Sequence, residues 1–145
     1  MDNFETAQLK LRPHHCGISV PDLATSVAWY RDVLGFSMDM HGQIPQAHAK
    51  VAFMRNGDFL LEIFEVESAV PMPESRRHPN TDITTHGTKH IAFEVPDIRK
   101  LIDHLKQKHV DIVWERPLSA YIRDNSGILI EFMQAGWTFE AAHKP

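Results

Sequence analysis

The sequence contains two copies of one pattern, and this internal repeat limits the possible folds more than any other feature. In the first copy, His15 precedes Asp22 of a Pro-Asp pair by seven positions; in the second copy, His90 precedes Asp97 by the same spacing. An alternating apolar segment separates each histidine from its Pro-Asp pair, which is typical of a half-buried strand. Apolar residues at helical spacing follow. A repeat of this kind indicates a duplicated supersecondary unit.

The first copy predicts a strand, a sharp turn and a helix. The apolar side chains of residues 15–20 share one face of the strand, which leaves His15 beside two small residues on the other face. Asp22 is placed to cap the helix, and Gly35 is placed to end it in a left-handed conformation.

Three further strand segments follow each helix, so the repeat corresponds to two βαβββ modules. The predicted strands are residues 36–41, 50–55 and 58–66 in the first module, and 111–116, 119–123 and 127–134 in the second. We predict one α+β domain over residues 1–145, with modules at about residues 13–66 and 88–134.

The predicted linker, residues 67–87, has three prolines, many polar residues and no regular period. Segments of this length inside a small domain tend to be functional or flexible. Arg76 and Arg77 in the linker have two interpretations. They grip a carboxylate or phosphate of a substrate, or they are simply solvated, as exposed arginines usually are.

Composition excludes several classes of function. The formal net charge is −4 at pH 7 and the basic residues form no cluster larger than a pair such as Arg76-Arg77, so we expect no binding to nucleic acid. No apolar run approaches membrane-spanning length, and the first residues lack the apolar segment of a secretory signal. Cys16 is the single cysteine, which excludes an internal disulfide. We therefore expect a cytoplasmic protein that acts on a small molecule and binds no membrane.

Four side chains are candidates for a shared metal site: His15, Glu62, His90 and Glu131, one histidine and one glutamate in each module. The first and last strands of a module must lie close together, so the two side chains converge on one face. Nitrogen and carboxylate donors suit a divalent first-row metal. A lone histidine or glutamate on a strand is usually hydrogen-bonded or solvated, but here the same residue types recur at the same module positions. His14 competes with His15, although alternation places its side chain on the opposite face.

The segments HCGISVPDLATSVAWYRDVLGF, KHIAFEVPDIRKLIDHL and YIRDNSGILIEF resemble the vicinal oxygen chelate superfamily. This group includes glyoxalase I, methylmalonyl-CoA epimerase, fosfomycin- and bleomycin-resistance proteins and extradiol dioxygenases. The resemblance covers about residues 13–134 and implies paired βαβββ modules forming a cleft or open half-barrel. It also implies that His15, Glu62, His90 and Glu131 bind a divalent metal (Zn, Ni, Fe, Co or Mn), and that the protein is a homodimer.

The resemblance implies a glyoxalase I-like lyase, isomerase or epimerase that acts on a small hydroxy- or oxo-carbonyl substrate through a metal-stabilised enediolate. Glu131 is the expected general base, with Glu62 as the symmetric alternative. The alternatives are a non-haem Fe(II) dioxygenase and a non-catalytic small-molecule binding or resistance protein. Two points stay open: whether Trp114 and Tyr121 line the cavity or only pack, and whether the modules pair within a chain or across a dimer.

Overall fold

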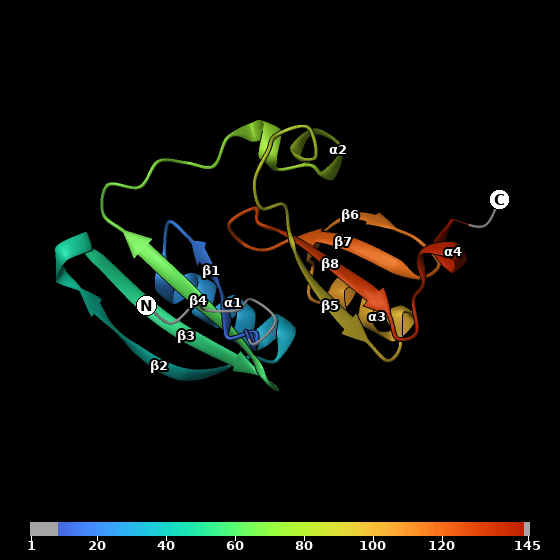
Figure 1. Ribbon diagram of the computed structural model, residues 1–145, viewed down its shortest axis with the longest axis horizontal. Coiled ribbons are helices and arrows are strands. Elements are labelled where there is room, and N and C mark those ends of the chain that lie inside the picture. Colours follow the sequence, from blue (N-terminus) through green and yellow to red (C-terminus); the bar gives the residue numbers. More distant parts are fainter. Residues whose placement is uncertain (1–8, 144–145) are drawn as a thin grey trace.

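The computed structural model describes residues 9–143, which form two four-stranded sheets lying side by side (Figure 1). The strand order is β1-β4-β3-β2 in sheet one and β5-β8-β7-β6 in sheet two. In each sheet the first and last strands of the module are parallel neighbours, and the other pairs are antiparallel. The predicted α+β fold of two tandem βαβββ modules is confirmed.

The strands follow the predicted segments closely. Those of sheet one are β1 (His15–Ser19), β2 (Ser37–Ile44), β3 (Ala49–Asn56) and β4 (Phe59–Val66). Those of sheet two are β5 (Ile91–Val95), β6 (Asp111–Glu115), β7 (Ser119–Arg123) and β8 (Leu129–Gln134). Strand β2 is longer than expected because β3 offers it pairing partners as far as Ile44, which lies opposite Ala49. A 3-10 turn (Pro45–Ala47) then connects the two strands.

Each module has one long helix, α1 (Leu23–Leu34) or α3 (Ile98–Gln107). The predicted caps are confirmed: the Asp22 side chain accepts the N–H of Thr25, and the Asp97 side chain accepts two N–H groups of the first turn of α3. Gly35 ends α1 with φ of 70°, a left-handed conformation that glycine adopts without strain. A last short helix, α4 (Phe139–Ala142), follows β8. Among residues 9–143, no helix is long and apolar enough to cross a membrane.

The linker is more regular than predicted. It contains a 3-10 turn (Glu74–Arg76) and a short helix, α2 (Pro79–Asp82), and it leads from β4 over to β5 (Figure 1). Pro79 occupies the first turn of α2, where its missing N–H is not needed, and the His78 side chain accepts the N–H of Asn80. Elements of a single turn produce no repeating period, so periodicity does not reveal them.

The main hydrophobic core lies between the helices and the sheets and is shared by both modules. It includes Ile63 of β4, Tyr30 of α1, and Ile102 of α3. The modules meet through aromatic contacts, such as the ring of Phe59 against that of Phe93 with centroids 5.1 Å apart. The two helices also touch, since His104 Nε2 of α3 lies 2.7 Å from the carbonyl oxygen of Val33 in α1. The helix-covered faces are therefore committed to packing within the chain.

Candidate metal centre

The first histidine–glutamate pair lies on sheet one, on the face opposite the core. His15 Nε2 is 3.2 Å from Glu62 Oε2, and the exposed fractions of the two side chains are 38% and 17%. Parallel pairing of β1 with β4 produces this contact. The pairing places Gly17 directly beside Glu62, and His15 lies two positions before Gly17 on β1. The absence of a side chain at Gly17 leaves room: a Cβ there would lie 3.6 Å from Glu62 Oε2.

The second pair repeats this arrangement on sheet two. His90 Nε2 is 3.0 Å from Glu131 Oε2, and the exposed fractions are 29% and 18%. Strand β5 pairs in parallel with β8, so that Ala92 lies beside Glu131. His90 itself stands just before β5 rather than within it. Both pairs thus combine an imidazole and a carboxylate that a divalent first-row metal accepts as ligands.

His14 does not lie on the far face as alternation predicts. Its Nδ1 atom is 2.7 Å from Nδ1 of His15. The reason is that β1 begins at His15, so the side-chain alternation of a strand does not extend to His14. This contact uses the His15 ring nitrogen that points away from Glu62, and partners of this kind orient metal-binding histidines.

The residues beside the two glutamates differ between the modules. In sheet one the row across the strands is Met40, Phe53 and Glu62; in sheet two it is Trp114, Tyr121 and Glu131. The Tyr121 hydroxyl lies 3.3 Å from His90 Nε2. Burial, followed by the negative charge of Glu131, raises the pKa of Tyr121, so this phenol stays protonated at neutral pH. Sheet two therefore carries a hydroxyl donor where sheet one has only Phe53.

Within one chain, the structure does not bring the four candidate ligands together. Among residues 9–143, no three His, Cys, Asp or Glu side chains are close enough to hold a metal ion. His15 and Glu62 form one half-site on sheet one, and His90 and Glu131 form the other on sheet two. Within residues 9–143, the four ligands expected at one centre instead form two separate pairs, each of one histidine and one glutamate.

A cavity of about 370 Å³ lies beside Glu131. Its aromatic walls are Trp114, Tyr121 and Trp137, so the first two residues line a cavity as well as pack against each other. Sequence patterns did not identify Arg116 or Trp137 as part of the site. Arg116 follows a strand and Trp137 follows the last predicted strand, and neither belongs to the repeat.

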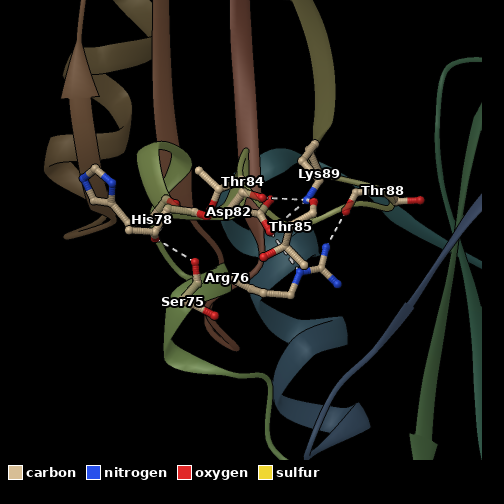
Figure 2. Close-up of polar contacts among 9 residues, drawn as sticks. Ser75, Arg76, His78, Asp82, Thr84, Thr85, Thr88 and Lys89 are labelled. Atoms are coloured by element: carbon tan, nitrogen blue, oxygen red, sulfur yellow. Dashed lines mark hydrogen bonds and ion pairs between the residues drawn. The ribbon is translucent and has the colours of Figure 1, made fainter.

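The linker arginines pair with carboxylates of the linker itself, which is neither of the two interpretations. Figure 2 shows the cluster around Asp82, whose side chain is 2% exposed. Arg76 Nε lies 2.9 Å and Lys89 Nζ 3.3 Å from its Oδ1 atom. Arg77 lies 3.6 Å from Glu74. Because Lys89 immediately precedes His90, the cluster anchors the linker next to the second half-site.

Comparisons with known proteins agree with this architecture. The family model described as "Glyoxalase/Bleomycin resistance protein/Dioxygenase superfamily" matches residues 12–132. Human mitochondrial methylmalonyl-CoA epimerase is 26% identical over 137 residues, covering 86% of this chain and 74% of that protein. The metallothiol transferase FosB of Staphylococcus epidermidis is 28% identical over 126 residues, covering 81% and 78%.

Among solved structures, the trypanothione-dependent glyoxalase I of Leishmania major superimposes with a TM-score of 0.71 at 22% identity. The match covers 86% of this chain and 87% of the other. At this level of identity the likeness concerns the fold, and one fold of this kind carries many reactions.

Proposed function

The chain belongs to the Glyoxalase/Bleomycin resistance protein/Dioxygenase superfamily, and from this premise we propose that it is a metal-dependent lyase, isomerase or epimerase of the glyoxalase I type. Its substrate is a small hydroxy- or oxo-carbonyl compound. One observation carries the proposal: a histidine and a glutamate are in contact at the same place on each sheet. The similarity to a methylmalonyl-CoA epimerase and to glyoxalase I supports it.

The chemistry follows from the donor set. His15, Glu62, His90 and Glu131 would hold a divalent first-row metal (Zn, Ni, Fe, Co or Mn), which would supply Lewis acidity at the substrate carbonyl. Glu131 takes the proton from the carbon next to that carbonyl and returns it, and Glu62 is the symmetric alternative. Tyr121, which stays protonated, places a hydroxyl donor beside His90 and Glu131.

A second copy of the chain completes the site. The two half-sites lie on different sheets, and each module uses the helix side of its sheet for packing within the chain. The opposite face of sheet one carries Met40, which is 54% exposed, in the same row as Glu62. In a homodimer, sheet one of one protomer faces sheet two of its partner, so that His15 and Glu62 meet the partner's His90 and Glu131.

Mixing two inactive variants tests this assembly. His15→Ala and His90→Ala each remove one ligand from both sites of a homodimer. A heterodimer of the two variants contains one intact site, so random re-assortment restores about a quarter of the wild-type sites. Metal content and activity of the refolded mixture are the readouts, and refolded single variants are the controls. If neither rises above the single variants, the shared site is excluded.

Proton exchange tests the reaction. The purified protein, analysed for metal, is incubated in D2O with a panel of hydroxy- and oxo-carbonyl compounds, and NMR follows loss of the proton beside the carbonyl. We expect Glu131→Gln to lose most of the exchange rate while keeping bound metal, because the amide oxygen still donates to a metal but accepts no proton. Full exchange in this variant would remove Glu131 from the role of base. Consumption of O2 with ferrous iron and substrate would identify an oxygenase instead.

The aromatic walls of the cavity favour one second candidate, a protein that sequesters a small molecule without turnover. Trp114, Tyr121 and Trp137 offer flat apolar surfaces of the type that hold aromatic ligands. Chelation separates the two functions. Binding by a sequestering protein survives removal of the metal, whereas the proposed enzyme loses exchange activity.

A further inference from the structure

Arg116 lines the cavity beside Glu131, and its backbone is held in a fixed position. It directly follows β6, and its backbone N–H donates a 2.8 Å hydrogen bond to the carbonyl oxygen of Ser119. Pro117 adds rigidity to the same turn because its ring restricts φ. The position of the Arg116 backbone is therefore set by the β6–β7 hairpin rather than by a mobile loop.

The guanidinium of Arg116 is held over an aromatic ring. Its central carbon lies 4.8 Å from the centroid of the Trp114 ring, which is a favourable cation–π distance. Arg116 and Trp114 line both the 370 Å³ cavity that contains Glu131 and a neighbouring cavity of about 240 Å³ that contains His90. The Arg116 side chain therefore borders two cavities, one lined by Glu131 and the other by His90.

Among the described residues, no carboxylate pairs with the charge of Arg116. Within residues 9–143, most arginines form an ion pair with a carboxylate, namely Arg31, Arg55, Arg76, Arg77 and Arg123. Arg116 forms none there. Arg12 and Arg99 also lack such a pair, but neither lines the two cavities. A stacked, exposed guanidinium with free donors is suited to bind a planar anion in a bidentate manner.

We propose that Arg116 binds a carboxylate of the substrate, so that the substrate is an acid with a charged group separate from the oxygens that bind the metal. This inference rests on the function proposed above and narrows its substrate class. The cavity volume falls in the range that small-molecule sites occupy. Leu118 and Trp137 add apolar lining to the same cavity, which suits the carbon chain of such an acid.

Two probes of similar shape test the proposal: 2-oxoglutarate, which has a distal carboxylate, and its 5-methyl ester, in which a neutral ester replaces it. Calorimetry on the full-length, metal-loaded protein gives both affinities. We expect wild type to bind 2-oxoglutarate about tenfold more tightly, the usual worth of a charge-assisted hydrogen bond. Arg116→Met loses this preference, and Arg116→Lys keeps part of it because lysine lacks the planar fork. Arg99→Met, the matched control, keeps it in full.

Three results would overturn the inference: equal binding of the two probes by wild type, binding of neither, or a preference that persists in Arg116→Met. Circular dichroism establishes that each variant is folded. Parallel elemental analysis and titrations of chelator-treated protein separate this inference from the proposed function. Metal-free protein with an Arg116-dependent preference supports the carboxylate subsite while the metal proposal fails. If the protein binds metal but shows no preference between the two probes, the metal proposal is supported and the carboxylate subsite fails.

Discussion

The hydroxyl of Tyr30 donates a 2.8 Å hydrogen bond to the carboxylate of Asp124, 94 positions further along the chain. Tyr30 lies on α1 of module one, and Asp124 follows β7 of module two. Both are buried, with Tyr30 fully inaccessible and Asp124 5% exposed. The contact joins the two modules on their helix side.

Replacement of Tyr30 by phenylalanine is expected to destabilise the fold. It removes the donor while the Asp124 carboxylate stays buried, which costs about 1–3 kcal/mol of unfolding free energy. Urea unfolding monitored by circular dichroism gives the value. Asp32→Asn, at an exposed pair with Arg31, is the control and should change the free energy little. An unchanged unfolding midpoint in Tyr30→Phe would show that the bond does not hold the modules together.

Asp124 should make stability depend on pH in an unusual direction. Burial raises its pKa, although hydrogen bonds from Ile128, Tyr30 and Ser126 oppose the effect. The folded state therefore binds the proton more readily than the unfolded state. This contribution is fully present below the ordinary aspartate pKa and is lost as the pH rises through the raised value. Wild type should lose stability relative to Asp124→Asn over that interval; a constant difference at all pH values would contradict the prediction.

Asp82 should act with the opposite sign. Burial alone would raise its pKa, but hydrogen bonds from Arg76 and Lys89 outweigh it, and the pKa lies below the usual value. The stability that Asp82 provides is present above the ordinary aspartate pKa and is lost as the pH falls through the lowered one. Asp82→Asn leaves two cations near a neutral group and should cost about 3–5 kcal/mol at neutral pH, less in acid. Unfolding curves of both proteins at neutral and acid pH measure this, and an equal cost at each pH would refute it.

Gly17 is expected to tolerate alanine but not leucine. A Cβ at this position would meet Phe64 at 3.5 Å and Glu62 Oε2 at 3.6 Å, which are ordinary contacts, and Ala92 occupies the equivalent position in sheet two. A longer side chain would displace the Glu62 carboxylate. Gly17→Leu should lower metal affinity about 10–100-fold, as loss of a supporting contact does.

Competition with a metal indicator measures that affinity. Gly42→Leu is the matched control, since no atom lies within 4 Å of a Cβ at that strand position. Equal metal affinities for Gly17→Leu and wild type would show that Glu62 is not a ligand.

The sequence alone determined the parts that depend on periodicity and on local capping. Alternation places His15 on the face opposite the core, the spacing of the repeat predicts its counterpart His90, and Asp22 and Asp97 cap their helices as expected. Parallel pairing within a module brings each histidine to its glutamate, because consecutive elements of a βαβββ unit leave little freedom in how its sheet closes.

Only the tertiary structure decided how one module sits against the other. The Tyr30–Asp124 bond and the separation of the two half-sites come from packing between segments distant in sequence. No local pattern encodes such relationships, since many surfaces are apolar enough to pack and the best fit depends on side-chain shapes across the whole interface. A repeat therefore predicts what each half contains, whereas the core formed between the halves determines which faces remain for a metal, a substrate or a second chain.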